Sequence, residues 1–230
     1  MAILEIKDIY KSFDNKKVID SVSFSIEKGK IVGLLGKNGS GKTTIIKMIN
    51  DLLTIDSGEI VINGEHVGNK SKALISYLPE KSYLDNSKTV AQIFKFFQDF
   101  YSDFDLEKAK SLLKDLDLDI NASLSKMSKG MKEKIQLVLV MSRKASLYIL
   151  DEPLGGVDPS TRDYIMQTIL SNFGEDASML ITTHLIADVE KILDEVIFID
   201  KGKIILNESA DELRKKEKTS INEIFRRVVK

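Results

Sequence analysis

The chain has 230 residues, a formal net charge of -1 and 43% hydrophobic residues, with two histidines and no cysteine. This composition supports a folded core, excludes disulfides and cysteine-based metal sites, and argues against a zinc site and against a general nucleic-acid binder, which is usually basic. Because no apolar run approaches the ~20 residues that span a bilayer, and the N-terminus lacks the basic start of a signal peptide, we expect a soluble protein. The absence of cysteine fits a reducing compartment.

The first 30 residues predict short strands joined as hairpins. Apolar and polar residues alternate from Met1 to Ile6, and Val22, Phe24 and Ile26 alternate again after a polar turn at residues 14–17. We therefore expect an antiparallel β unit beside the main core.

The next stretch predicts a phosphate-binding loop. An apolar run at residues 31–35 precedes a glycine-rich segment, and a helical pattern at residues 44–49 follows it. Glycines let backbone N–H groups point at an anion, and the helix adds the positive end of its dipole. Lys42 supplies a charge for the β- and γ-phosphates, and the Thr43 hydroxyl is placed for Mg²⁺. A glycine-rich turn that fits by chance arises in on the order of 1% of chains this long. The predicted nucleotide-binding residues are Gly36, Lys37, Asn38, Gly39, Ser40, Gly41, Lys42, Thr43 and Thr44.

Residues 88 to about 124 change character and predict a helical unit. Thr89 can cap a helix, and six aromatic residues lie between Phe94 and Phe104. The main interpretation is the core of a small helical subdomain, and the alternative is a surface on which another protein docks.

The other predicted elements alternate between strands and helices, which indicates a parallel α/β sheet. Strands are predicted at 59–64, ending in an Asn-Gly turn, at 75–78, 147–150, 178–183 and 195–199, and antiparallel at 203–206; helices are predicted at 106–118, 131–142, 161–170 and 185–193. Residues 211–230 hold seven Lys/Arg against four Asp/Glu. They predict a solvated C-terminal helix, with membrane-surface contact as the minor alternative.

Two adjacent carboxylates, Asp151 and Glu152, follow the apolar strand at 147–150. Ligand chemistry in open α/β folds lies at the carboxyl ends of strands, so Asp151 is placed to hold Mg²⁺ and Glu152 to activate water as a general base. A surface Asp-Glu pair is the alternative.

His184 follows the next core strand, where a contact to the γ-phosphate is expected. Met127–Met131 opens a helix, so Ser128 and the backbone at Gly130 form either a second anion site or an ordinary N-cap.

From Phe13 to about Leu206, the order and spacing of these motifs resemble the nucleotide-binding subunit of ATP-binding cassette (ABC) transporters. The resemblance implies that Phe13 stacks on adenine and that residues 36–44 form the Walker A loop. It also implies that Thr43, Glu80 and Asp151 ligate Mg²⁺, and that Ser128 and Gly130 bind ATP within the signature motif 127–131. Glu152 and the switch histidine His184 are catalytic by the same resemblance. Val157 and Asp158 lie in the D-loop by the same resemblance.

Three motifs depart from the family pattern, at four residues. Glu80 replaces the usual glutamine of the Q-loop, Lys129 and Met131 replace a glycine and a glutamine of the signature, and Gly155 replaces the usual D-loop serine. The Q-loop variant at residues 77–80 and the signature variant at residues 128–131 look like those of bacterial ABC-2-type exporter subunits.

The implied fold is an α/β P-loop NTPase with a RecA-like parallel sheet core, an N-terminal antiparallel β subdomain and a helical subdomain inserted between Walker A and Walker B. We expect one ABC ATPase domain over 1–230, with the nucleotide-binding core at about 1–85 and 143–210, the helical signature subdomain at about 86–142, and a charged tail at 211–230.

The implied function is ATP binding and hydrolysis that powers a membrane exporter through head-to-tail dimerisation. The expected partners are a separate transmembrane permease and a second ATP-binding subunit, identical or different, and no nucleic acid; the expected location is cytoplasmic, at the inner face of the membrane. One alternative is an ABC-type ATPase that acts as a mechanical switch on a non-transport complex. An ordinary nucleotide kinase is a weaker alternative, because no acceptor site is evident.

Overall fold

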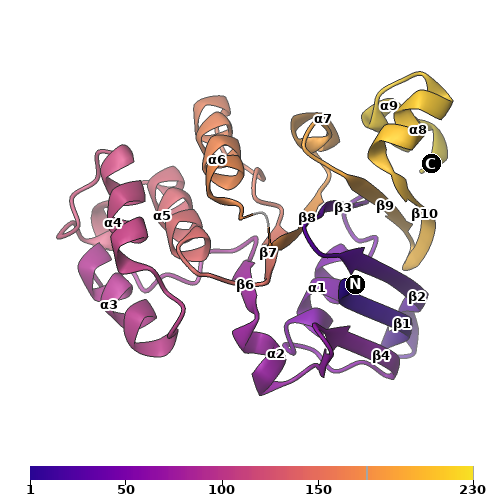
Figure 1. Ribbon diagram of the computed structural model, residues 1–230, viewed down its shortest axis with the longest axis horizontal. Helices are drawn as coiled ribbons and strands as arrows, with labels where there is room; N and C mark the ends of the chain where they lie inside the picture. Colours follow the sequence, from indigo (N-terminus) through magenta and orange to yellow (C-terminus); the bar gives the residue numbers. More distant parts are fainter. Residues whose placement is uncertain (175, 230) are drawn as a thin grey trace.

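A computed structural model describes residues 1–174 and 176–229. Its N-terminal strands form an antiparallel sheet of order β2-β1-β4-β5 (Figure 1), built from β1 (Ala2–Phe13), β2 (Lys16–Glu27), β4 (Ser57–Ile62) and β5 (Glu65–His66). Asn63 and Gly64 both have positive φ, as the predicted Asn-Gly turn requires. The expectation of short strands at residues 1–30 is wrong, because Asp8 and Ser21 take positive φ at irregularities in the ladder and let one long hairpin continue through them.

The second sheet contains the predicted parallel core. Its order is β10-β9-β3-β8-β7-β6, with β3 parallel to β8 and β9, and β7 parallel to β6 and β8. The edge strand β10 runs antiparallel to β9, as predicted. The bounds are β3 (Ile31–Leu35), β6 (Ile75–Leu78), β7 (Leu147–Asp151), β8 (Ser178–Thr183), β9 (Glu195–Asp200) and β10 (Lys203–Ser209).

The parallel sheet separates two hydrophobic cores. Along β7, Leu147 and Ile149 point into the core shared with α1 (Lys42–Ile49) and the antiparallel sheet. Tyr148 and Leu150 point into the core shared with the other helices. Because successive strand residues face opposite sides, a strand covered on both faces must be apolar throughout.

Helices α3, α4 and α5 gather at one end of the molecule (Figure 1). Thr89 caps α3 as predicted, and its hydroxyl accepts from the Gln92 N–H at 3.3 Å. Phe94 is buried while Phe96 and Phe100 are exposed, so the aromatic stretch supplies both a core and a surface. The bounds are α2 (Asn69–Ala73), α3 (Val90–Phe100), α4 (Leu106–Asp115), a short 3-10 helix (Leu124–Lys126), α5 (Lys129–Met141) and α6 (Pro159–Asn172).

Buried Arg143 joins this helical group to the parallel sheet. Its guanidinium donates two hydrogen bonds of 3.0 Å to the Asp103 carboxylate and others to the carbonyls of Ala73 and Ile75. The same guanidinium lies 3.9 Å from the centre of the Tyr101 ring. One side chain therefore connects α3 and the segment after it to the start of β6.

The C-terminal residues correct two predictions. The helix expected at 185–193 is only α7 (Ile186–Val189), because Asp194 turns back to the sheet and exchanges hydrogen bonds with the backbone of Ile31. The solvated C-terminal helix is instead a packed pair, α8 (Ala210–Glu217) and α9 (Ile221–Val228). The buried Phe225 ring meets Phe198 of β9 edge to face at 5.2 Å, so this segment belongs to the core.

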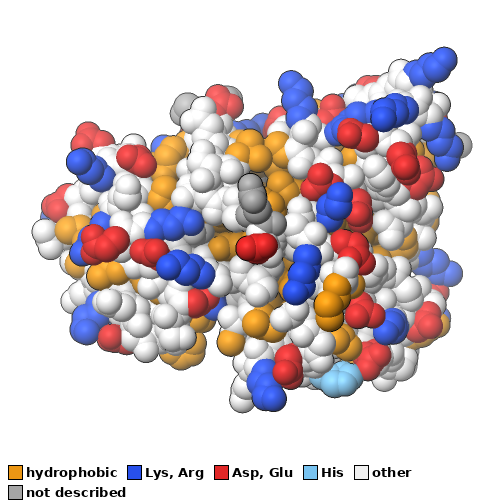
Figure 2. Space-filling model, viewed as in Figure 1, with side chains coloured by type: hydrophobic (Ala, Val, Ile, Leu, Met, Phe, Trp, Pro, Cys, Tyr) orange, Lys and Arg blue, Asp and Glu red, His pale blue; other side chains and the backbone are white. Residues whose placement is uncertain are grey.

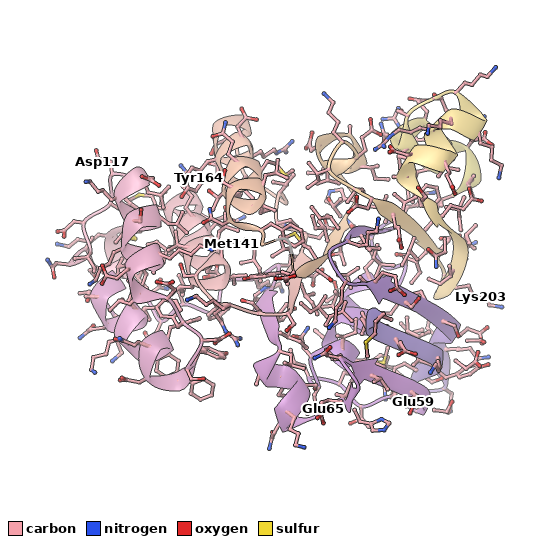
Figure 3. All side chains as sticks on the ribbon, in the orientation of Figure 1. Glu59, Glu65, Asp117, Met141, Tyr164 and Lys203 are labelled. Atoms are coloured by element: carbon pink, nitrogen blue, oxygen red, sulfur yellow. The ribbon has the colours of Figure 1, made fainter. Side chains whose placement is uncertain are left out.

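The long axis runs from the helical group to the β10 edge, and the labelled Asp117 and Lys203 mark its two ends (Figure 3). Charged side chains of both signs are spread over the face in Figure 2, in keeping with the formal net charge of -1. Among residues 1–174 and 176–229, no helix combines the length and hydropathy needed to cross a membrane.

Candidate functional site

The glycine-rich loop lies between β3 and α1, and its shape depends on glycine at two positions. A Cβ at Gly36 would lie 2.4 Å from the Ser40 Oγ and 2.6 Å from the Ile199 carbonyl oxygen. Gly41, at the N-cap of α1, has φ 111° and would carry a Cβ 2.6 Å from the Ile19 side chain. The loop therefore approaches the neighbouring strands more closely than any residue with a side chain allows.

Lys42 is 5% exposed and lies inside the curve of this loop. Its ammonium donates to the Gly36 carbonyl at 2.8 Å and to the Lys37 carbonyl at 3.3 Å. The third neighbour is the Glu152 carboxylate, whose Oε1 lies 3.2 Å from Nζ. Two carbonyl oxygens therefore accept hydrogen bonds from the ammonium group, and the Glu152 carboxylate adds an ion pair in which its Oε1 forms no hydrogen bond.

Asp151 ends β7 with a side chain that is almost fully buried. Its Oδ1 accepts a hydrogen bond of 2.6 Å from the Thr182 hydroxyl and one of 3.4 Å from the Thr43 hydroxyl. Burial raises the pKa of the Asp151 carboxyl above its ordinary value, and these two hydrogen bonds oppose that shift.

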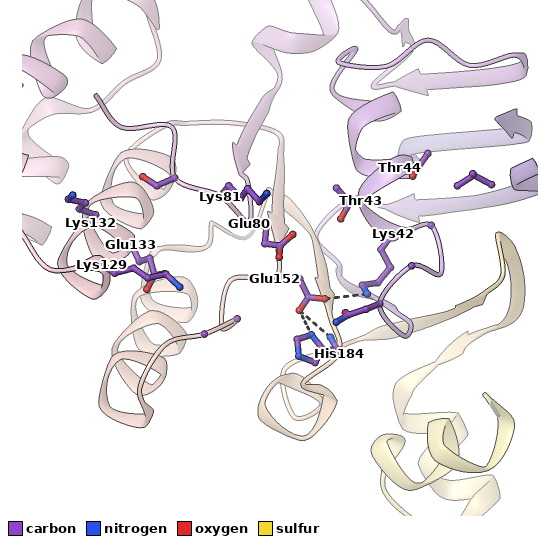
Figure 4. Close-up of a pocket in the computed structure, with 17 residues that line it drawn as sticks. Lys42, Thr43, Thr44, Glu80, Lys81, Lys129, Lys132, Glu133, Glu152 and His184 are labelled. Atoms are coloured by element: carbon purple, nitrogen blue, oxygen red, sulfur yellow. Dashed lines mark hydrogen bonds and ion pairs between the residues drawn. The ribbon is translucent and has the colours of Figure 1, made fainter. Parts of the chain in front are cut away.

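Glu152 connects the loop to the end of β8. Its Oε2 accepts from the His184 backbone N–H at 3.2 Å and lies 2.8 Å from the His184 Nδ1. Its backbone has φ 50°, and its N–H donates to the Thr182 carbonyl at 3.0 Å and to the Thr182 hydroxyl at 3.1 Å. Figure 4 shows the Glu152 side chain between Lys42 and His184.

These groups open into a cleft of about 810 Å³ between the glycine-rich loop and the N-terminal part of α5. Figure 4 shows Glu80 and Lys81 between these two sides. The cleft is lined by Val18, Asn38, Gly39, Gly41, Lys42, Thr43, Thr44, Glu80, Lys81, Ser82, Lys129, Lys132, Glu133, Glu152, Gly155, Gly156 and His184.

The remaining predicted site residues lie in three places. Gly36, Lys37, Ser40 and Asp151 stand directly beside or beneath the lining residues of the loop and strand. Ser128 caps α5, where its hydroxyl accepts from the Met131 N–H at 3.2 Å, and Gly130 follows in the first turn. Phe13, at the end of β1, is 44% exposed, and the Lys11 ammonium lies 5.6 Å from its ring centre. Phe13, Ser128 and Gly130 do not contribute to the lining of the cleft within this chain.

Sequence reasoning missed the Thr182 hydroxyl and the side chains of Lys81, Lys132 and Glu133. Thr182 carried a weak signal, because it follows the apolar residues 179–181 in a predicted strand that ends beside the predicted site residue His184. The other three could be placed only once the fold brought α5 opposite the loop.

Comparison with known proteins now identifies the family. A family model described as ABC transporter matches residues 19–155, more than half of the chain. The ABC transporter ATP-binding protein YtrB of Bacillus subtilis (strain 168) is 32% identical over 215 residues, which cover 92% of this chain and 74% of the relative. The chain belongs to the ABC transporter family. The SkfA peptide export ATP-binding protein SkfE of the same organism is 30% identical over 211 residues, covering 89% of this chain and 88% of the relative.

A solved structure of the ATP-binding subunit of an ABC transporter covers 99% of this chain and 100% of its own, with a TM-score of 0.89 and 26% identity. The predicted P-loop NTPase fold, with its parallel sheet and its antiparallel β unit, is thereby confirmed. As a member of the ABC family the chain is an ATPase that binds ATP and couples its hydrolysis to membrane transport.

Proposed function

We propose that this chain is the ATPase subunit of an exporter whose permease is a separate polypeptide. The observation that carries the ATPase role is Glu152, which lies between the cation of the phosphate loop and His184 at the carboxyl edge of the parallel sheet. SkfE, a peptide export protein, aligns along most of this chain, which supports export as the direction. The ATPase then works at the inner face of the membrane, held there by its permease.

The proposed site uses Mg²⁺ together with ATP, and the residues present fit such an ion. Two ligand oxygens at adjacent octahedral positions, each about 2.1 Å from Mg²⁺, are about 3 Å apart. Thr43 Oγ1 and Asp151 Oδ1 are 3.4 Å apart, so a small rotation brings both within reach of one ion. Glu80 lines the same cleft and would add a second carboxylate. Bound Mg²⁺ neutralises charge on the β- and γ-phosphate oxygens.

The protein groups then have separate tasks. Backbone N–H groups of residues 38–44 and the Lys42 ammonium bind the phosphates. The Glu152 carboxylate accepts a proton from the attacking water, and His184 orients that carboxylate and contacts the γ-phosphate. Phe13 stacks on adenine at the exposed end of β1.

We further propose that two such subunits close head to tail around ATP, with Ser128 and Gly130 reaching the phosphates of the opposite subunit. In support, these residues lie at the N-terminus of α5 and contribute nothing to the cleft of their own chain. In this proposal the chain is one ABC ATPase domain, with its signature subdomain at about 86–142.

The test is affinity purification of the tagged chain from detergent-solubilised membranes, followed by mass spectrometry. A stoichiometric multi-span membrane protein supports the proposal. A purely soluble partner, or none, contradicts it and favours the mechanical switch on a non-transport complex.

The exposed rings of Phe96 and Phe100 refine this experiment. They stack at 5.8 Å on the outer face of α3, and 58% and 68% of these residues is exposed. If the aromatic stretch is also a docking surface, changing both to alanine lowers the yield of the membrane partner. Leu52→Ala, which removes another exposed apolar side chain, serves as the control and leaves that yield unchanged.

A further inference from the structure

Thr182 is a fully buried polar residue in the middle of the site. It belongs to β8, in which every residue is buried, and it pairs in register with Asp151 of the parallel strand β7. Valine has almost the same shape and is preferred in such strands. A buried hydroxyl is retained there only if it finds hydrogen-bond partners.

The Thr182 hydroxyl uses both of its hydrogen-bonding capacities on the two acidic residues. It donates to the Asp151 carboxylate at 2.6 Å and accepts from the Glu152 N–H at 3.1 Å. Its backbone carbonyl accepts from the same N–H at 3.0 Å. A hydroxyl is the smallest group that can do both, and a valine side chain can do neither.

The first bond sets the direction of the Asp151 carboxylate. The short bond from Thr182 holds Oδ1 at one place, where the Thr43 hydroxyl also reaches it at 3.4 Å. A carboxylate held in this way has its two oxygens in one orientation beside Thr43. Groups that orient a metal-binding carboxylate typically change metal affinity or activity by about 10–100-fold when they are removed.

The second bond supports an unfavourable backbone. Glu152 has φ 50°, a conformation that costs a residue with a side chain about 1–3 kcal/mol. Its N–H is shared between the carbonyl and the hydroxyl of Thr182, and these contacts hold the backbone in that conformation. The Glu152 side chain is consequently directed toward Lys42 and His184.

We propose that Thr182 is a positioning residue for ATP hydrolysis, which orients the carboxylate of Asp151 and the backbone of Glu152 through one hydroxyl. This inference rests on the proposed roles of those two residues. Thr182 itself touches neither nucleotide nor water in this scheme and acts through them.

The test compares Thr182→Val, which removes the hydroxyl at nearly constant shape, with Thr182→Ser, which keeps it. Ser178→Ala is the matched control, because Ser178 is a buried hydroxyl residue at the other end of β8 that bonds to the backbone of Gly29 and Glu27, outside the site. For each variant, thermal unfolding checks that the protein is folded, and kcat and KM measure ATP hydrolysis. ATP affinity is measured in EDTA without metal and then as a function of Mn²⁺ concentration, which gives the Mn²⁺ midpoint for ATP binding. Thr182→Ala replaces the valine variant if that variant does not fold.

For Thr182→Val we expect kcat to fall about 10–100-fold and the Mn²⁺ midpoint for ATP binding to rise at least about tenfold. ATP affinity in EDTA should be unchanged, because Lys42 and the glycine-rich loop remain intact. Thr182→Ser should restore both the rate and the midpoint to within about threefold, and Ser178→Ala should change neither.

The inference is overturned if Thr182→Val keeps the wild-type midpoint and kcat, if Thr182→Ser fails to restore them, or if Ser178→Ala produces the same losses. Failure of the proposed function is distinguishable, since a wild-type chain that hydrolyses no ATP refutes the ATPase role directly. The Mn²⁺ dependence of ATP binding still decides the role of Thr182 in that case.

Discussion

The ion pair between Lys42 and Glu152 leads to a prediction about affinity rather than rate. Both side chains are more than nine-tenths buried, and the pair occupies the ammonium group that a β-phosphate needs. Nucleotide binding must therefore break the contact. Changing Glu152 to Gln should weaken the contact that opposes binding, so we expect the isolated chain to bind ADP more tightly.

The size of the effect follows from the geometry. At 3.2 Å and an effective dielectric constant of about 20, the Coulomb attraction is about 5 kcal/mol. The loss of hydration on burying two charges offsets most of that attraction. Since the Glu152 Oε1 makes an ion pair and no hydrogen bond with Lys42, glutamine removes the attraction that remains, about 1.5 kcal/mol at the low end for close charge pairs. A difference of about 1.4 kcal/mol corresponds to an ADP affinity about tenfold higher.

Calorimetric titration of ADP into the monomeric protein is the assay, because ADP avoids the dimer that ATP is expected to trap. Glu133→Gln is the control: it removes a carboxylate from the same cleft that pairs with Lys129 and not with Lys42. It reports how much affinity is gained merely by reducing negative charge. Equal affinity for Glu152→Gln and wild type, or an equal gain in both variants, would refute the reasoning.

Three other changes have expected outcomes. Lys42→Ala should lower ATP affinity at least about tenfold by calorimetry, since a charge-assisted phosphate contact is lost; unchanged affinity would contradict the assignment of the phosphate loop. Ser128→Ala should slow ATP hydrolysis at protein concentrations that allow dimers while leaving nucleotide affinity of the monomer unchanged, and a loss of monomer affinity would place Ser128 in its own chain's site. Arg143→Met should lower the free energy of unfolding by about 3 kcal/mol in urea titrations, because the partly buried carboxylate of Asp103 loses its partner; a loss below about 1 kcal/mol would show that the contact is dispensable.

The parts of the site that sequence predicted are those in which chemistry is contiguous along the chain. The glycine-rich loop, Lys42 and Thr43 lie within one strand–loop–helix unit, and Asp151 and Glu152 adjoin one apolar strand. A parallel sheet collects the carboxyl ends of its strands at one edge, so proximity of these groups follows from fold class alone.

Contacts that depend on strand register were beyond prediction. The bond from Thr182 to Asp151 exists because these residues are paired between β7 and β8, and a register shifted by one residue would turn the Thr182 side chain to the other face of the sheet. The position of α5 across the cleft likewise depends on packing rather than on local pattern.

The prediction of a solvated C-terminal helix was wrong for a different reason. Their apolar positions, Leu213, Ile221, Ile224 and Phe225, are divided between two helices of eight residues each, so neither helix shows a long periodic stripe. The surrounding charges then dominate the composition, and a buried pair of helices resembles a solvated tail.

Separate contacts hold the backbone and the side chain of Glu152, and this difference suggests how nucleotide releases the side chain alone. Its backbone N–H donates a hydrogen bond to Thr182, a residue in the centre of the sheet, while its carboxylate forms ion pairs with Lys42 and His184 at the cleft. A phosphate that draws the Lys42 ammonium away frees one carboxylate oxygen and leaves the backbone in place. The side chain can then turn toward a water without any rearrangement of β7 or β8. On this view both changes lower turnover, since Glu152 is the proposed base and Thr182 positions the Glu152 backbone and Asp151. Only Glu152→Gln should also raise ADP affinity, because only that change weakens the side-chain contact with Lys42.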